Sequence, residues 1–358
     1  HVDGVYSARS QGASALMFDL EGAEILRGPQ GTLFGRNATG GVVNLHTAKP
    51  KLDYFEANAE FTLGNYDRRA TRAMVNLPLT DTLAIRVAAA VDKSEGVVDM
   101  APGSAMGRKY GSTDLAAARF SAFWQPNDNF DWFLSYENFI DQGTGHIPTV
   151  SGGSDRSAYI QEPGFNDFVI DSLRTRLNYN FDNGITVSYI GGYTDSSRES
   201  VWDRSWDENK YEWGGCVECT HEATQHELQL KNEDSARLQW MVGMFYFKEN
   251  NSTIFDIVHP DVDYEGGSTP NPNLWSTYRQ PDRGLKSNSI YAQSTYKLTD
   301  VFRISLGLRY TEDERWDRGG RNIMCPDVKR TENLPLNSDY VGLLDPDNLL
   351  NGLAPNKH

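Results

Sequence analysis

The chain has 358 residues, of which 49 are acidic and 34 are basic, giving a formal net charge of −15. This excess of carboxylates argues against a nucleic-acid partner, because neutralising phosphates requires a basic face. No apolar run approaches the roughly 18 to 20 residues that a membrane helix needs. Membrane-spanning strands stay compatible with this composition, because they show an apolar side chain to lipid only at every second residue.

The first fifty residues consist of short extended runs around one irregular loop. Strand-like runs are expected at residues 2–6 and 15–18, and further runs at residues 23–26 and 42–47 enter and leave the loop. Five glycines and a proline lie between the last two runs. Glycine adopts positive φ without steric cost, so this composition predicts a series of tight turns.

The loop reads LRGPQGTLFGRNATGG, and Arg27 and Arg36 are its only charged residues. A phosphate-binding loop would need a Lys-Ser/Thr pair after the glycines, and this sequence has none there. Asn37-Ala38-Thr39 matches an N-glycosylation pattern, but patterns this short are common by chance. The candidate functional residues are those of the uninterrupted motif: Arg27, Gly28, Pro29, Gln30, Gly31, Gly35, Arg36, Asn37, Thr39, Gly40 and Gly41.

From residue 54 onward, apolar and polar side chains alternate. The alternation is clearest at residues 55–63 and 302–310, and weaker at residues 185–193 and 238–246. A period of two places one set on each face of a strand, so these segments are predicted to be strands with one apolar face. Aromatic residues gather toward the strand ends, as in the girdles of membrane barrels.

Two kinds of connection separate these strands. Short turns are expected at residues 78–81, 126–129, 182–184, 233–236 and 298–300. Long polar loops are expected at residues 95–112, 142–170, 198–222 and 250–283, and from residue 312 onward. Outer-membrane barrels have short turns at one end and long loops at the other. The strand count is about 11, half of the roughly 22 of a plugged transporter, so we expect the chain to be an internal piece of a longer protein.

The motif loop closely resembles the block that ends the plug domain of TonB-dependent outer-membrane receptors. Further segments are similar to the same family: HVDGVY at residues 1–6 to a plug strand, residues 76–89 to the first periplasmic hairpin, HELQL at residues 226–230 to a wall strand, and residues 289–311 to a later hairpin. The resemblance spans most of residues 1–315, without the long loops or the tail after Trp316.

The resemblance implies an all-β fold, a transmembrane antiparallel β-barrel with part of an N-terminal plug inside its lumen. Residues 1–50 would be the C-terminal part of the plug, and residues 51–358 the N-terminal part of the barrel with its long extracellular loops. The protein would lie in the outer membrane of a Gram-negative bacterium, in contact with its lipid. The missing first half of the plug would carry the TonB box, through which TonB, with ExbB and ExbD, supplies energy.

The function that the resemblance implies is active uptake of a scarce nutrient. The expected small-molecule ligand is a ferric siderophore or another iron chelate, and a carbohydrate or a cobalamin-type ligand stays open. A passive porin is the alternative of a different class, but it has no use for the plug motif. We find no G-x-S-x-G elbow and no assembled catalytic triad, so the sequence predicts neither an enzyme nor a cofactor.

Arg27 and Arg36 are the candidate gating residues. An isolated charge buried in a barrel lumen is costly, so each guanidinium must be paired or hydrated. By resemblance, plug arginines of this kind face wall carboxylates and form a releasable lock, and Glu227 in the HELQL strand is the candidate wall partner. Alternatively, each arginine lies in a hydrated crevice or pairs with a nearby acid such as Glu24.

Three cysteines, Cys216, Cys219 and Cys325, are too few for a disulfide framework. Cys216 and Cys219 fall in an expected extracellular loop, where an oxidising compartment favours a local disulfide. With His221 they could instead bind a soft metal. No histidine follows at the spacing of a zinc motif, and His226 would lie on the opposite face of a strand from His221, so we assign no metal site.

The same expected loop is rich in aromatic residues, which are the candidate ligand contacts: Trp202, Trp206, Tyr211 and Trp213. Exposed aromatic side chains on a rigid scaffold often bind a partner, in this case an aromatic or planar chelate. Alternatively, they pack loop against loop or lie at the outer lipid interface.

Overall fold

The structure is a computed structural model, and it describes most of the chain. The described residues are 1–7, 17–35, 37–104, 109–144, 157–160, 164–203, 213–233, 236–259 and 274–324. Within these ranges, no helix has both the length and the apolar character to cross a membrane.

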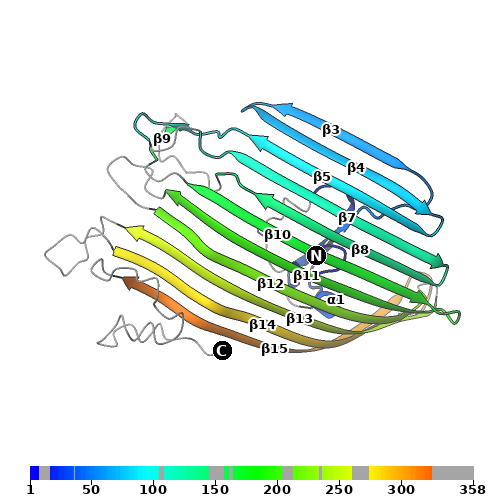
Figure 1. The fold of residues 1–358 in the computed structure, drawn as a ribbon. Helices are drawn as coiled ribbons and strands as arrows, with labels where there is room; N and C mark the ends of the chain where they lie inside the picture. Colours follow the sequence, from blue (N-terminus) through cyan, green and yellow to red (C-terminus); the bar gives the residue numbers. More distant parts are fainter. Residues whose placement is uncertain are drawn as a thin grey trace, which may run out of the picture.

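The main element is one antiparallel sheet of eleven strands, in which each strand pairs with the next along the chain. The strands are β3 (Glu56–Gly64), β4 (Arg68–Thr80), β5 (Leu83–Ser94), β7 (Thr113–Asn127), β8 (Phe130–Asp141), β10 (Phe165–Asn180), β11 (Ile185–Asp203), β12 (Trp213–Asn232), β13 (Leu238–His259), β14 (Leu274–Lys297) and β15 (Arg303–Met324). The sheet is curved, with β3 and β15 as its edges (Figure 1). The predicted all-β fold is confirmed, as is the number of strands.

The two faces of this sheet have opposite chemistry. On β8, Ser135 and Glu137 point inward and are 0 % and 3 % exposed, whereas Trp132 and Tyr136 point outward and are 36 % and 46 % exposed. Leu308 on β15 is 70 % exposed. A soluble sheet would bury its apolar face, because burying apolar surface is the main favourable term in folding. An apolar outer face and a polar inner face are typical of a barrel wall in lipid.

The connections follow the predicted pattern at one end of the sheet and correct it at the other. Tight turns join β4 to β5, β7 to β8, β10 to β11, β12 to β13 and β14 to β15, as expected. The connection between β5 and β7 spans the predicted residues 95–112. The other long loops are shorter than predicted, because β10 begins at Phe165, β11 continues to Asp203, β12 begins at Trp213, β13 continues to His259, β14 begins at Leu274 and β15 continues to Met324. Both faces of these extensions carry polar residues, so the period-two signal fades although the backbone pairing continues.

Two short strands, β6 (Asp99–Met100) and β9 (Ser157–Ala158), form a small parallel pair. β6 belongs to the connection between β5 and β7, and β9 to the connection between β8 and β10. Beside this pair, Val98, Tyr110 and Ile160 form a buried cluster. Burial raises the pKa of the Tyr110 phenol to about 12, and the negative charge of Asp203 adds to this shift.

Residues 1–50, which we call the N-terminal segment, contain a separate two-stranded sheet. Strand β1 (Leu20–Arg27) pairs antiparallel with β2 (Gly41–Thr47), and the short helix α1 (Gly31–Phe34) lies between them. These strands match the predicted runs at residues 23–26 and 42–47. The strand expected at residues 2–6 is wrong: Asp3 and Gly4 have φ values of 52° and 85°, so the chain reverses there. We call residues 2–6 the N-terminal turn.

The N-terminal segment lies against the inner, polar face of the large sheet (Figure 1). Its contacts run from β5, where Arg86 binds Asp19, to β15, where the Arg309 guanidinium donates to the backbone oxygen of Thr32 at 3.3 Å. We call the large eleven-stranded sheet the wall. Its polar inner face is therefore partly covered by the N-terminal segment.

Candidate functional site

The N-terminal turn is fastened to the middle of the wall by strands β11 and β12. The Gln225 side-chain amide accepts a hydrogen bond from the Tyr6 backbone N–H at 2.7 Å and donates one to the Gly4 backbone oxygen at 3.2 Å. Gly192 on β11 lets the turn approach closely, because a Cβ there would lie 2.3 Å from a methyl carbon of Val5. One amide and one glycine thus fix the position of this turn.

A buried ion pair holds the segment near its first strand. The Arg86 guanidinium on β5 binds both carboxylate oxygens of Asp19, at 2.8 and 2.5 Å, with Glu56 at 3.4 Å. Arg86 is only 5 % exposed. Such a bidentate pair between arginine and a carboxylate is both strong and directional, so it ties residue 19 to the wall.

A second group of buried charged side chains lies next to the pair of Arg86 and Asp19. Glu137 accepts hydrogen bonds from Arg119 at 2.6 Å and from Arg174 at 3.0 Å. The same guanidinium groups reach the N-terminal segment: Arg119 donates to the backbone oxygen of Phe18 at 3.0 Å, and Arg174 lies 3.6 Å from the Asp3 carboxylate. The wall therefore offers cations, and the segment offers carboxylates and carbonyl oxygens.

Of the two candidate gating arginines, the structure describes one. Arg27 is exposed at the end of β1 and forms no ion pair with any other described residue. Arg36 lies outside the described residues. The alternative pairing with Glu24 is not observed for Arg27, since the described contact of Glu24 is His46 at 3.8 Å.

Glu227 points inward from β12 and is 7 % exposed. Its carboxylate accepts hydrogen bonds from the Tyr291 hydroxyl and from Gln229, at 3.0 Å for the latter. Arg309 lies beside the ring of Tyr291 and contacts the motif loop, because its guanidinium donates to the backbone oxygen of Thr32. The described partners of Glu227 therefore belong to the wall.

The motif loop folds as the closed end of the β1–β2 hairpin. The Gly28 N–H donates to the Gly40 oxygen at 3.2 Å, and the Gln30 N–H donates to the Ala38 oxygen at 2.8 Å. Positive φ values occur at Gly28, Gly35, Asn37 and Gly41, as expected from the composition. Pro29, Thr39 and Gly40 lie in irregular parts of the same loop, and Gly31 begins α1. A Cβ at Gly35 would lie 2.8 Å from the Arg309 guanidinium, so glycine permits this approach.

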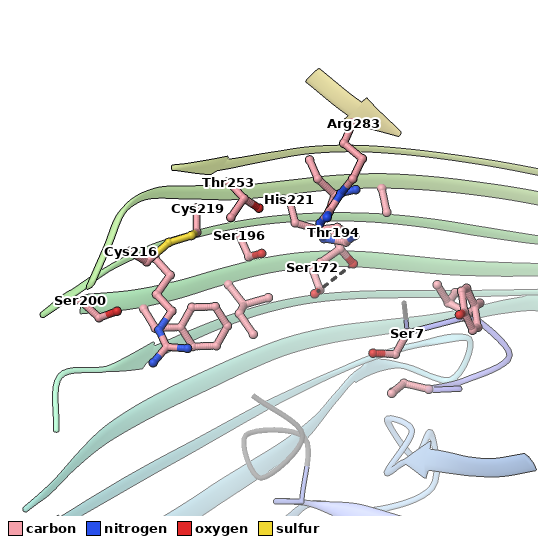
Figure 2. Close-up of a pocket in the computed structure, with 18 of the residues that line it drawn as sticks. Ser7, Ser172, Thr194, Ser196, Ser200, Cys216, Cys219, His221, Thr253 and Arg283 are labelled. Carbon is pink, nitrogen blue, oxygen red and sulfur yellow. Dashed lines mark hydrogen bonds between the residues drawn. A yellow bond between two sulfur atoms is a disulfide. The ribbon is translucent and has the colours of Figure 1, made fainter. Parts of the chain in front are cut away.

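A cavity of about 370 Å³ lies between the N-terminal turn and strands β10 to β14. We call it the outer pocket. Val5 and Ser7 line it from the N-terminal segment, opposite Thr194, Ser196 and Thr253 on the wall (Figure 2). Its volume lies in the range of small-molecule sites.

The charge of the outer pocket is opposite to that of the whole chain. Arg174, Arg198 and Arg283 line it together with His221, and no aspartate or glutamate is among its described lining residues. Arg198 donates to the Asn166 side-chain oxygen at 3.0 Å, and Arg283 donates to that of Gln280 at 3.1 Å. These two guanidinium groups have neutral partners, so an anion could add to them without displacing a carboxylate.

The cysteines lie on a strand, not in the predicted loop. Cys216 and Cys219 are joined by a disulfide on β12 and line the outer pocket (Figure 2). The strand pairing slips by one residue between Cys216 and Glu218, which is a β-bulge. His221 lies 3.4 Å from Glu249, and His226 is on the outer face, bonded to Tyr189. No group of three or more potential metal ligands occurs within the described ranges.

Only part of the aromatic set can be placed. Trp202 lies on β11 and lines the outer pocket, with its ring 5.6 Å from that of Phe255. Trp213 begins β12. Trp206 and Tyr211 lie outside the described residues, as does Cys325.

Sequence reasoning missed the residues that line the pocket and hold the turn, above all Arg174, Arg198, Arg283 and Gln225. For two of them, the sequence contains a signal in the alternation along the strand. Arg174 and Arg198 share the inward phase of their strands with Ser172 and Ser196, which line the same pocket. Polar residues at every second position of a strand with an apolar opposite face point into the lumen.

A family model described as "TonB dependent receptor-like, beta-barrel" matches residues 137–333 of this chain. Among curated proteins, the metal-pseudopaline receptor CntO of Pseudomonas aeruginosa strain UCBPP-PA14 is 30 % identical over 189 residues, which cover 49 % of this chain and 25 % of that protein. The pesticin receptor of Yersinia pestis is 46 % identical over 50 residues, 14 % of this chain and 7 % of that receptor.

Two solved structures share the fold. The ferric yersiniabactin uptake receptor FyuA from Yersinia pestis superposes with a TM-score of 0.73 at 17 % identity, over 90 % of this chain and 50 % of that one. The open form of the ferric-catecholate import receptor Fiu from Escherichia coli gives 0.67 at 17 % identity, over 89 % and 53 %. This chain thus spans about half the length of the solved receptors and less of the curated relatives.

Proposed function

Since the chain belongs to the TonB-dependent receptor-like β-barrel family, we propose that it takes up an anionic metal chelate in the outer pocket. Proteins of this family are outer-membrane receptors and not enzymes, and the wall described above is part of such an outer-membrane barrel. We assign residues 1–50 to the plug and residues 51–358 to the barrel. The separate β1–β2 sheet and its contacts with the inner face of the wall support this division.

One observation carries the proposal for the ligand: three arginines and no described carboxylate line the outer pocket of a chain with net charge −15. Guanidinium groups bind carboxylates and other oxyanions through paired hydrogen bonds. Ferric siderophores and similar chelates present anionic oxygens, and Trp202 adds an aromatic face. The names of CntO as a metal-pseudopaline receptor and of FyuA as a ferric yersiniabactin receptor agree with this ligand class.

A neutral carbohydrate fits this pocket less well, because it leaves Arg198 and Arg283 without a charged partner. A cobalamin-type ligand offers these arginines only the single negative charge of its phosphodiester. A passive porin fits less well too, because the N-terminal segment occupies the inner face of the wall.

Gating is proposed to use the interface between segment and wall. TonB, with ExbB and ExbD, would pull a segment that precedes residue 1 in the complete receptor. The pull would have to break the Asp19–Arg86 pair and the Asp3–Arg174 contact. Arg27 and Arg36 stay proposed as gating residues of the motif loop, and Glu227 is proposed to act on that loop through Arg309.

The test uses the complete receptor, purified in detergent, and a panel of radioactive iron probes. Ferric citrate and a ferric tricatecholate are the anionic chelates. A ferric trihydroxamate, in which three hydroxamates balance the charge of Fe³⁺, is a neutral chelate and serves as a control together with a neutral maltodextrin. We expect saturable binding of at least one anionic ferric chelate and none of the maltodextrin. Binding of the neutral sugar alone would overturn the proposed ligand class. Increased abundance of the protein in outer membranes of iron-starved cells is a second expected result.

A further inference from the structure

A second cavity, of about 340 Å³, lies on the other side of the N-terminal turn from the outer pocket. We call it the inner cavity. The turn separates the two spaces: Val2 and Val5 face the outer pocket, and Asp3 lines the inner cavity. Arg174 lines both. A single guanidinium group is therefore within reach of ligands on either side of the turn.

The inner cavity holds cations whose hydrogen-bonding capacity is only partly used, although Arg174 also donates to Glu137 at 3.0 Å. The Nε atoms of Arg174 and Arg176 are both buried and have no hydrogen-bond acceptor. Neither Arg176 nor Lys49, another lining residue, forms an ion pair with any residue that the structure describes. Burying a donor without an acceptor is unfavourable, which makes such a group a candidate for an ordered water or ion.

The acids of the inner cavity leave these donors available. Asp3 accepts hydrogen bonds from the Thr47 backbone N–H at 2.9 Å and from the Thr47 hydroxyl at 2.8 Å, so its carboxylate is held away from Arg174, at 3.6 Å. Glu21 lines the cavity from the exposed side of β1 and has no ion pair with a described residue. Neither carboxylate supplies the acceptors that Arg174 and Arg176 lack.

We propose that the inner cavity is a second anion site, for an anionic oxygen group such as a carboxylate. Arg174 binds this group first from the outer pocket and then, when the N-terminal turn moves, together with Arg176 on the inner side. An oxyanion gives Arg174 the short hydrogen bonds that Asp3 does not give. Binding thereby also loosens the contact between Asp3 and the wall. This inference rests on the proposed function for the identity of the ligand and for the movement of the N-terminal turn.

The test measures the affinity of the inner cavity for anions without any siderophore. Gly22 lines the cavity, and a Cβ there would meet no atom within 4 Å, so Gly22→Cys introduces a thiol at little structural cost. Gly31→Cys is the matched control, because it has equal space and does not line the cavity. Both variants are made in the complete receptor with Cys325→Ser, and the disulfide between Cys216 and Cys219 does not react.

The readout is the ratio of the reaction rates of an anionic and a cationic methanethiosulfonate reagent of similar size. We expect this ratio to be at least about fivefold higher at position 22 than at position 31, because uncompensated cations lie close to the first thiol. Arg176→Gln and, independently, Lys49→Gln should lower the ratio toward that of the control, and Arg176→Lys should retain it. Two variants keep the test valid if one of them fails to fold.

Selenate distinguishes a binding site from a diffuse positive potential. At ionic strength matched with chloride, selenate should slow the reaction of a neutral reagent at position 22 and not at position 31, and Arg176→Gln should abolish this protection. Equal ratios at both positions, or protection that Arg176→Gln leaves unchanged, would overturn the inference. Since no chelate is present, failure here leaves the ligand test above unaffected, and the reverse also holds.

Discussion

The inward-facing arginines fall into two groups with different surroundings. Arg86 and Arg119, beneath the N-terminal segment, are bound to the carboxylates of Asp19 and Glu137. Within the described part of the chain, the hydrogen bonds of Arg198 and Arg283 in the outer pocket go to neutral amide oxygens. The same side chain thus holds the chain's own segment in one region and is left for an anion in the other. Whether an inward-facing arginine has a structural or a ligand-binding role therefore depends on the group to which it donates its hydrogen bonds.

The largest expected effect comes from the buried carboxylate of the first group. Glu137→Gln leaves Arg119 and Arg174 without their shared anion, and breaking a buried ion pair costs about 3 to 5 kcal/mol. We expect a clearly lower temperature for the heat-induced mobility shift of the complete barrel on gels. Glu60→Gln on the exposed face of β3 is the control and should shift nothing. An unchanged transition in Glu137→Gln would contradict the structural role.

The next effect concerns the hold of the wall on the N-terminal segment. Asp19→Asn removes the charge that binds Arg86 and should weaken the attachment by about 1.5 to 3 kcal/mol, the range of hydrogen bonds to charged groups. Faster proteolysis within residues 1–50 of the complete receptor is the expected result. A double-mutant cycle with Arg86→Gln should show coupling between the two sites. Additive effects would mean that the pair does not fasten the segment.

A smaller effect is expected at the N-terminal turn. Gly192→Ala places a methyl group 2.3 Å from Val5, so the turn must shift, at a cost of about 1 to 2 kcal/mol for overpacking. Faster cleavage near residue 6 should follow. Val5→Ala removes the clashing methyl groups, so the double variant should return to the cleavage rate of Val5→Ala alone. Without this rescue, the close approach would not be what positions the turn.

The smallest effect is expected for the disulfide on β12. Cys216 and Cys219 are three positions apart, and a short closed loop gains the least stability from a cross-link. Replacing both with serine should change chelate affinity less than about threefold, because neither residue carries the charge that binds the ligand. Alkylation of the untreated protein, followed by mass measurement, should label neither cysteine until a reductant is added. Labelling without reductant would contradict the disulfide.

The sequence predicted the fold better than the site, for physical reasons. Alternation with a period of two is local, so segments such as residues 302–310 identify their own strand and its apolar face. Hydropathy fails where a strand leaves the lipid, which is why the sequence pattern predicts a loop at Cys216 and Cys219 although both lie on β12. The motif loop was recognisable because its turns need glycine at fixed positions, such as Gly28 and Gly35.

Long-range contacts are not encoded in any such local pattern. The prediction placed arginines on the N-terminal segment and a carboxylate on the wall. The described contacts are reversed, with Asp3 and Asp19 on the segment and Arg174 and Arg86 on the wall. Asp19 and Arg86 are 67 positions apart, and only the folded sheet shows that they meet. The proposed roles of Arg27, Arg36 and Glu227 stay predictions for the complete receptor.

The most direct test of the comparison measures chelate affinity and uptake side by side in the complete receptor. We expect Arg198→Gln and Arg283→Gln each to weaken binding of the best ferric chelate about tenfold or more, since each removes a charged donor to an anion. Asp19→Asn should leave that affinity within about twofold and alter only the rate of iron uptake into cells. Unchanged affinity in both arginine variants would contradict the account, because the outer pocket would then not be where the anion binds.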